Sequence, residues 1–190
     1  MASSAPAFVP ADFPGEITLD QVIPGADAQF APLPPDLRRP LVAALAGRGI
    51  ERLYTHQAEA YRAIRGGRHL VVVTPTASGK TLCYNLPVLQ RLLEDPERRA
   101  LYVFPTKALA QDQLAELSAL KHGLPIDVRV DTYDGDTAPG RRTAIREGGH
   151  IVMTNPDMLH TGILPHHTRW RRLFSSLEFV VIDELHTYRG

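Results

Sequence analysis

The sequence is poor in cysteine, with Cys83 as the single example among 190 residues. One cysteine excludes an internal disulfide framework, and it excludes a structural zinc or iron–sulfur cluster held by four cysteines of this chain. Cys83 stands in an apolar stretch, which predicts a buried small side chain rather than a reactive thiol.

Long apolar runs are absent, because no stretch reaches the roughly 18 consecutive apolar residues that a membrane-spanning helix needs. The first residues, MASSAPAFVPADF, lack the basic start and the continuous apolar stretch of a secretory signal. Both observations predict a cytoplasmic location and no membrane partner.

An excess of charge of one sign is also lacking, since 21 Lys and Arg stand against 21 Asp and Glu. A protein that binds nucleic acid tightly by itself usually carries a basic excess or stripe. The balance argues against such a stand-alone binder, but it is compatible with one wall of a larger cleft.

The chain divides into a proline-rich start and a regular remainder. Residues 1–35 hold seven of the 16 prolines, which predicts an irregular or extended N-terminal arm. Apolar spacing predicts a helix over 36–46 and a second over 56–64, for which Thr55 is the expected N-cap. Residues 36–190 then form the predicted main domain.

Five apolar runs separated by helical or mixed stretches follow the two helices. They are residues 69–74, 100–105, 126–132, 150–154 and 178–183. Several are almost uninterrupted by polar residues, which is typical of strands covered on both faces. The alternation predicts an α/β fold, a doubly wound and mainly parallel sheet with helices on both faces and ligands at the carboxyl ends of its strands.

The first of these runs leads into TPTASGKT at 74–81, and an apolar helix-like segment follows. A strand, a loop of small residues and a helix start together favour a bound phosphate. Lys80 suits the β- and γ-phosphates of a nucleoside triphosphate, and the Thr81 hydroxyl suits Mg²⁺. The backbone of the preceding loop residues is the candidate phosphate cradle: Thr76, Ala77, Ser78 and Gly79. Thr74 stands where the strict motif has its first glycine.

The last apolar run ends in the acidic pair Asp183 and Glu184. An aspartate directly after a buried strand suits a Mg²⁺ ligand, either direct or through water. Glu184 is placed to orient and polarise an attacking water. The pair therefore predicts the hydrolytic half of a nucleotide site.

Two other strand ends carry small polar turns followed by helices. Thr106 and Lys107 follow the second strand, and Thr154, Asn155 and Asp157 follow the fourth. Neighbouring helix N-termini suit successive phosphates of a nucleic-acid strand, largely without reading its sequence. Simple helix capping explains these residues equally well.

In combination, these motifs resemble the first RecA-like lobe of a superfamily 2 DEAD/DEAH-box-like helicase, over roughly residues 35 to 190. The resemblance rests on Thr55-His-Gln57, TPTASGKT (74–81), PTKALAQDQ (105–113), TNPDMLH (154–160) and DELH (183–186). Threonine at position 74 matches the helicase form of the loop. LYTHQAEA (53–60) and DELHTYRG (183–190) are most similar to the bacterial MrfA-type (YprA-like) DNA-repair helicases, with the Lhr type as a near alternative.

The resemblance assigns roles at the nucleotide site. It implies that Gln57 reads the adenine edge, which makes ATP the cofactor together with Mg²⁺. It implies that Lys80 and Thr81 hold phosphate and metal, that Asp183 holds the metal, and that Glu184 is the catalytic carboxylate.

The resemblance also assigns roles outside the nucleotide site. It implies that His186 couples the nucleotide site to a partner lobe. It places Thr106, Lys107, Thr154, Asn155 and Asp157 on the backbone of single-stranded nucleic acid, and Gly135, in the loop 133–137, beside them. DNA as the substrate, movement from 3′ to 5′ and a part in DNA repair are implied by the resemblance alone.

A motor of this kind needs a second RecA-like lobe with an arginine finger, which these residues do not contain. Such an arginine contributes about 10³ to 10⁵ in rate. We therefore expect residues 1–190 alone to bind ATP weakly, to hydrolyse it very slowly and not to unwind duplexes. A non-helicase P-loop ATPase or kinase, a DEAD-box-like RNA helicase lobe and a non-catalytic lobe regulated by ATP remain alternatives.

Overall fold

A computed structural model of the chain describes residues 28–74 and 78–188. The strands are β1 (Phe30–Pro32), β2 (Arg52–Tyr54), β3 (Arg99–Val103), β4 (Val130–Thr132), β5 (Ile151–Thr154) and β6 (Leu177–Ile182). The α-helices are α1 (Arg39–Ala46), α2 (Thr55–Arg65), α3 (Thr81–Glu94), α4 (Lys107–Lys121), α5 (Pro139–Gly148), α6 (Pro156–Met158) and α7 (Arg171–Ser175). Short helices of other types are η1 (Leu159–Ile163), η2 (Leu164–Trp170) and η3 (Leu185–Thr187).

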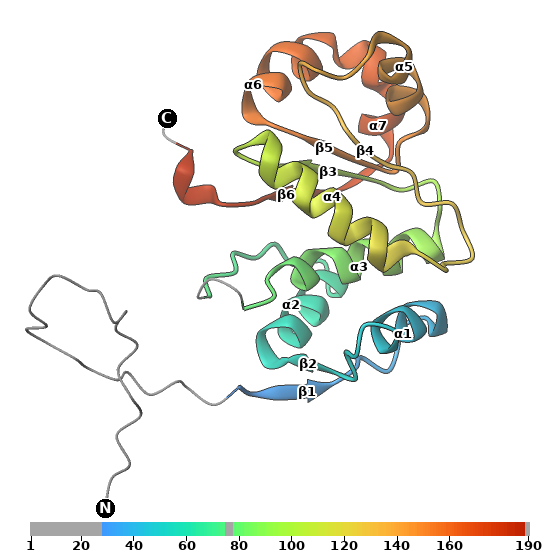
Figure 1. Cartoon of the computed structure of the whole chain (residues 1–190), viewed down its shortest axis with the longest axis vertical. Coiled ribbons are helices and arrows are strands. Elements are labelled where there is room, and N and C mark those ends of the chain that lie inside the picture. The colour runs from blue at the N-terminus through green and yellow to red at the C-terminus, as the bar shows by residue number, and fades with distance from the viewer. Residues whose placement is uncertain (1–27, 75–77, 189–190) are drawn as a thin grey trace, which may run out of the picture.

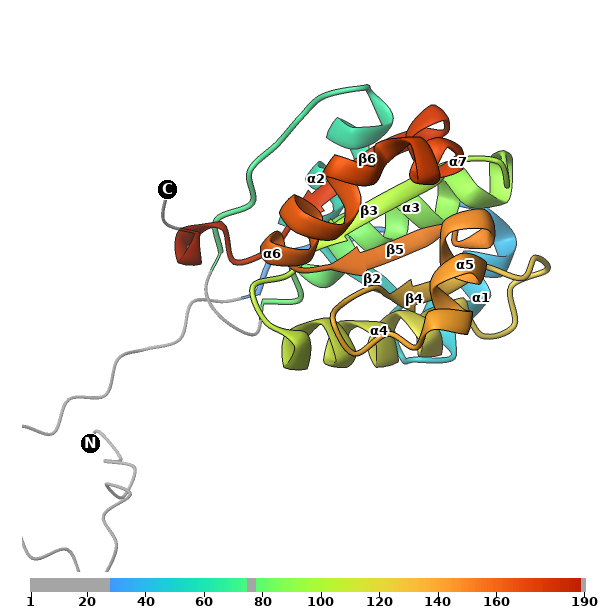
Figure 2. The ribbon, with the colours of Figure 1, turned by 90° about the horizontal axis from the view of Figure 1, so that it is seen from above.

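The main sheet has four parallel strands in the order β4-β5-β3-β6 (Figures 1 and 2). Parallel neighbours need crossover connections, and helices supply them between β3, β4, β5 and β6. A separate antiparallel pair joins β1 to β2. The predicted arm up to residue 27 lies outside the described residues, and the domain boundary at residue 35 stays a prediction.

Helices cover both faces of the main sheet, so the predicted doubly wound architecture is confirmed (Figure 1). The side chains of β3 divide between two cores because they alternate along the strand. Tyr102 faces the core made with α1 to α4, and Leu101 and Val103 face the core made with α5, α7 and Trp170. All residues of β3 and β5 are buried, as the apolar runs predict.

The two predicted N-terminal helices are present with small differences in their ends. The second begins at Thr55, so Tyr54 rather than Thr55 is the N-cap, and that prediction is wrong by one residue. The reason is a side chain: the Tyr54 N–H donates to Gln57 Oε1 at 2.9 Å, which closes the first turn one residue earlier.

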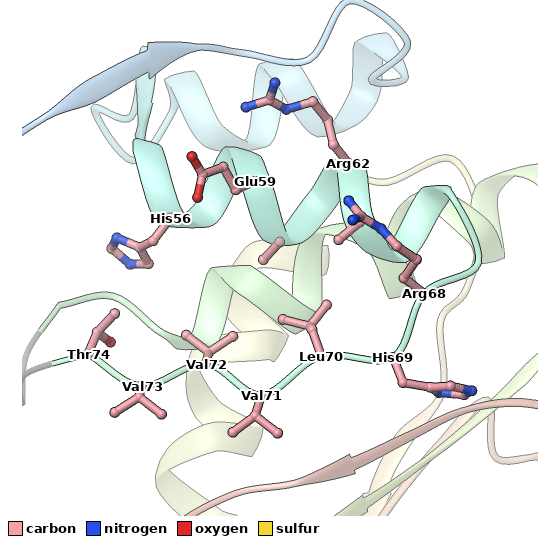
Figure 3. A pocket seen from close by; sticks show the side chains of 12 residues that line it. His56, Glu59, Arg62, Arg68, His69, Leu70, Val71, Val72, Val73 and Thr74 are labelled. Atoms are coloured by element: carbon pink, nitrogen blue, oxygen red, sulfur yellow. The ribbon is translucent and has the colours of Figure 1, made fainter.

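The predicted strand over 69–74 is wrong, because those described residues belong to no strand. The segment runs alongside α2 with alternating side chains. Leu70 and Val72 point toward α2, and Val71 and Val73 point away from it (Figure 3). Val71 is 76% exposed and Val73 88% exposed. The geometry of a strand is set by its neighbours, and within the described part of the chain no strand pairs with this segment.

The run 178–183 forms β6, but its expected burial on both faces is wrong. β6 is an edge strand, and the layer of α5 and α7 leaves Val180 56% exposed and Ile182 51% exposed. The run 126–132 forms a strand only from Val130, because the Val128 carbonyl accepts a hydrogen bond from Lys121 at 2.6 Å instead of joining the ladder.

Cys83 lies inside α3 and is 2% exposed, which confirms the predicted buried thiol. Burial raises the pKa of its thiol to about 11, so the thiol is not a nucleophile at neutral pH. Among the helices of the described residues, none combines the length and apolar character needed to cross a bilayer.

Candidate functional site

The carboxyl ends of β5, β3 and β6 lie side by side. In the ladder Val103 is opposite Thr154 on one side and Ile182 on the other. The pairing continues one residue further, where Phe104 N–H donates to Thr154 O at 2.9 Å and Asp183 N–H donates to Val103 O at 3.0 Å. The three sequence motifs that follow these strands therefore meet along one edge of the sheet.

The phosphate loop approaches this edge from α3, which begins at Thr81. The Lys80 ammonium donates to Thr74 O at 2.8 Å, so the lysine reaches back across the loop. The Ser78 and Thr74 hydroxyl groups are 2.6 Å apart. The predicted loop residues Thr76 and Ala77 lie outside the described residues.

Gln57 ties α2 to the phosphate loop. Its Nε2 donates to Gly79 O at 2.8 Å, while its Oε1 accepts from Tyr54 N–H. Gly79 has a φ of +72°, and a Cβ at that position would lie 2.6 Å from Gln57 Nε2. Glycine is therefore required at this position both by backbone conformation and by the close approach of Gln57.

Tyr84 lies near both predicted metal ligands. It stands one helical turn after Thr81 in α3, and its hydroxyl donates to Gln113 Oε1 at 3.1 Å. Burial, followed by the charge of Asp183, raises the pKa of Tyr84 far above its usual range, so the phenol stays protonated. Mg²⁺ prefers hard oxygen ligands, and the Thr81 hydroxyl and the Asp183 carboxylate are ligands of this kind. The residues present therefore fit this ion.

Glu184 has an unusual backbone. Its φ of 50° makes it the one non-glycine residue with positive φ among the described residues. The Glu184 N–H donates to Asp183 Oδ1 at 2.9 Å, and His186 Nδ1 lies 3.3 Å from Glu184 Oε2. Strained backbone of this kind is concentrated at functional sites, and here it lies between the end of β6 and the start of η3.

The predicted nucleic-acid residues also cap helices or support loops. Thr106 Oγ1 accepts from Leu109 N–H at 3.2 Å and begins α4, and Asn155 Oδ1 accepts from Met158 N–H at 2.8 Å and begins α6. The Thr154 side chain is 2% exposed and donates to a carbonyl of the neighbouring loop. Asp157 is exposed in α6.

The loop after β4 faces the start of α4. Lys107 Nζ donates to Asp136 Oδ2 at 2.5 Å, which joins the two predicted motifs, and this bond raises the pKa of Lys107. Gly135 lies in the same loop, and its carbonyl accepts from Arg142 Nη2 at 3.1 Å.

Tyr84 and Arg142 are the residues at this edge that the sequence motifs do not include. A signal for Tyr84 is its spacing, since a residue three positions after Thr81 in a helix shares its face. Arg142 carries no comparable signal, because its partners are backbone carbonyls of a loop that precedes it.

A hollow of about 590 Å³ lies between α2 and residues 68–74 (Figure 3). Its walls are the exposed side of α2, including His56 and Glu59, and the apolar segment that follows. Among the described residues of the phosphate loop, Thr74 alone lines the hollow, and its described walls include none of Lys80, Asp183 and Glu184.

Comparison with known proteins agrees with this geometry. The family described as DEAD/DEAH box helicase matches residues 54–190. The "Uncharacterized ATP-dependent helicase YprA" of Bacillus subtilis is 57% identical over 86% of this chain and 22% of its own. The ATP-dependent helicase hrq1 of Schizosaccharomyces pombe is 45% identical over 88% of this chain and 16% of its own.

A solved structure gives the same result. The DUF1998 helicase MrfA bound to DNA and AMPPNP superposes with a TM-score of 0.84 at 57% identity, over 87% of this chain and 23% of that one. The chain belongs to the DEAD/DEAH box helicase family. Within that family, it matches the first RecA-like lobe of the MrfA-type helicases, and it spans only about a fifth of the length of these relatives.

Proposed function

We propose that the chain is the N-terminal ATP-binding lobe of an ATP-dependent 3′ to 5′ DNA helicase that acts in DNA repair. In this proposal the lobe binds ATP with Mg²⁺ and one face of single-stranded DNA, and it separates strands only together with a second lobe. The observation that carries the proposal is the pairing of a phosphate loop, which Gln57 holds through the Gly79 carbonyl, with Asp183 at the carboxyl end of β6, where its N–H donates to Val103 O.

The chemistry of the proposed hydrolysis follows from the placement of these groups. Lys80 and the start of α3 bind the β- and γ-phosphates and neutralise their charge. Mg²⁺, when held by Thr81 and Asp183, supplies further positive charge against the phosphate oxygens. Glu184 orients the attacking water and accepts its proton, and its contact with His186 links this step to a neighbouring lobe.

The proposed DNA surface is the row of strand ends beside the nucleotide site. Thr106, Lys107, Gly135, Asn155 and Asp157 lie on loops and helix starts of adjacent elements. Contacts of this type bind the phosphate backbone without reading bases. The relative MrfA has been solved bound to DNA, which supports DNA rather than RNA as the substrate.

The test uses the full-length protein with both lobes. Lys80→Ala and Glu184→Gln are each expected to abolish DNA-stimulated ATP hydrolysis while leaving the thermal unfolding temperature unchanged. The matched controls are Lys121→Ala, whose ammonium bonds to a loop carbonyl at the other end of α4, and Glu147→Gln at an exposed position of α5. Normal stimulated turnover in either site variant would refute the role assigned to that residue.

The alternatives give different results in the same assay. A P-loop ATPase or kinase outside the helicases would show Lys80-dependent turnover that ignores DNA. A non-catalytic lobe would be unchanged by Glu184→Gln in every measurement. Stimulation by RNA but not by DNA would identify an RNA helicase lobe. The cytoplasmic location stays a prediction.

A further inference from the structure

The contact between Lys107 and Asp136 lies on the surface where nucleic acid is proposed to bind. Their side chains are 48% and 80% exposed, so a ligand can reach both. Lys107 is the first residue of α4, where the positive end of the helix dipole adds to its own charge. The Asp136 carboxylate therefore already occupies the position beside Lys107 where a phosphate oxygen of the nucleic acid is expected.

The Asp136 carboxylate is presented by an ordered loop. Arg142 donates to the carbonyls of Thr137, Asp134 and Gly135, at 2.8, 3.3 and 3.1 Å. The Asp136 N–H itself donates to Asp134 Oδ1 at 2.9 Å, and Asp134 is only 8% exposed. The loop conformation thus does not depend on the Lys107 contact, and Asp136 stays close to Lys107 when a competitor arrives.

We propose that Asp136 competes with the nucleic-acid phosphate for Lys107 and so lowers the affinity of this lobe for single strands. This inference rests on the proposed function, because it assumes that single-stranded nucleic acid binds the surface that contains Lys107. A carboxylate and a phosphate oxygen are both anionic acceptors for an ammonium group. A bound phosphate must displace Asp136 or lie beside it, and like charges at that distance repel.

The size of the effect follows from the exposure of the pair. Exposed ion pairs are weak and screened by salt, so removal of the Asp136 charge is expected to tighten binding by about two- to fivefold. Releasing Lys107 from its partner also adds up to one neutralised phosphate, which steepens the dependence of log affinity on log salt by up to about 0.7 for a single strand.

The experiment measures binding of a fluorescent oligodeoxythymidine to the full-length protein without nucleotide, over a range of salt concentrations. The Asp136→Asn protein is expected to bind the oligonucleotide more tightly and with a steeper salt dependence than the wild type. Asp136→Ser, which also removes the negative charge, is expected to do the same. The matched control is Asp131→Asn in β4, whose carboxylate pairs with Arg141 instead. In a Lys107→Ala background, Asp136→Asn is expected to change nothing.

The outcomes separate the two proposals. Unchanged or weaker binding of both Asp136 variants, with normal binding by the wild type, overturns the competition and leaves the proposed function intact. A gain that persists in the Lys107→Ala background also overturns it, because the charge would then act elsewhere. A wild-type protein that fails to bind single-stranded DNA overturns both.

Discussion

At the scale of single residues, Tyr84 lies close to both halves of the nucleotide site. It follows Thr81 by one helical turn, and the charge of Asp183, about 100 residues further along the sequence, helps to raise the pKa of its hydroxyl. Polar neighbours of metal ligands orient them, and their loss typically lowers metal affinity by about 10- to 100-fold.

We therefore expect Tyr84→Phe in the full-length protein to raise the Mg²⁺ concentration for half-maximal ATP hydrolysis by about tenfold or more. The control is Tyr102→Phe, which removes a fully buried hydroxyl that donates to Asn85 at 3.0 Å. That variant should lower stability and leave the Mg²⁺ dependence unchanged. Equal Mg²⁺ dependence in both variants would contradict the orienting role.

Gly79→Ala tests the contact between Gln57 and the phosphate loop. Alanine at a positive φ costs about 1–2 kcal/mol by itself, and here its Cβ also meets Gln57 Nε2. The control is Gly123→Ala, with a φ of +82° and nothing within 4 Å of the added Cβ. We expect both to destabilise the fold and only Gly79→Ala to weaken binding of a fluorescent ATP analogue. Equal nucleotide affinity in the two variants would show that the Gln57 contact does not shape the loop.

His150 predicts a dependence of stability on pH. Burial, followed by the charges of Arg99 and Arg129, lowers its pKa to about 4, and its neutral Nδ1 accepts from Arg129 N–H at 3.0 Å. The unfolded chain binds a proton that the folded chain excludes. The free energy of unfolding is therefore expected to fall as the pH drops from about 6.5 toward about 4. Above about pH 6.5, His150 makes this free energy neither rise nor fall with pH.

Urea unfolding at about pH 7.5 and about pH 5 measures this effect. His150→Asn keeps an acceptor near the Nδ1 position and cannot be protonated, so its stability should decline less between the two pH values. Identical declines in wild type and variant would assign the pH dependence to other groups.

Residues at a fixed offset from an apolar run were predictable, and residues that depend on distance in space were not. Asp183, Thr81 and Lys80 were found because each stands at a fixed offset from an apolar run. Tyr84 and Arg142 lie outside the motifs, because their partners depend on how segments far apart in the sequence, or a helix and the loop before it, meet in space. Thr106 and Asn155 cap their helices, which the capping alternative expected, and their contact with nucleic acid stays a prediction.

At the scale of elements, an apolar run shows that a segment is extended but not how many neighbours it has. The runs of β3 and β5 are buried on both faces, as predicted. The runs at 69–74 and in β6 have the same composition, but they keep half or more of several valine and isoleucine side chains exposed. Amino-acid composition does not encode the order of strands in a sheet, so a central strand and an edge strand can have the same apolar sequence.

Matched substitutions distinguish these environments. Val71→Thr is expected to change the free energy of unfolding by less than about 0.5 kcal/mol, because the side chain is 76% exposed. Val152→Thr in β5 buries a hydroxyl at a position that is 1% exposed, and it should cost about 1–3 kcal/mol. Denaturant unfolding of the two variants checks the difference, and equal costs would mean that residues 69–74 are packed in solution.

At the scale of the whole molecule, the chain matches about a fifth of the length of its relatives. In the proposed function, hydrolysis needs an arginine finger from a second lobe, and such an arginine contributes about 10³ to 10⁵ in rate. We expect residues 1–190 alone to hydrolyse ATP at least about 10³-fold more slowly than the full-length protein. Steady-state hydrolysis with and without DNA measures both, and comparable rates would show that the lobe is self-sufficient.

Under the proposed function, the ends of β5, β3 and β6 would also carry force between the strand grip and the hydrolytic residues. The proposed strand grip follows β5, the hydrolytic pair follows β6, and both bond to the last residues of β3 through main-chain atoms. Two strand spacings, about 10 Å, separate grip from chemistry. The link is thus short and stiff, and because backbone hydrogen bonds carry it, it survives changes of side chain along β3.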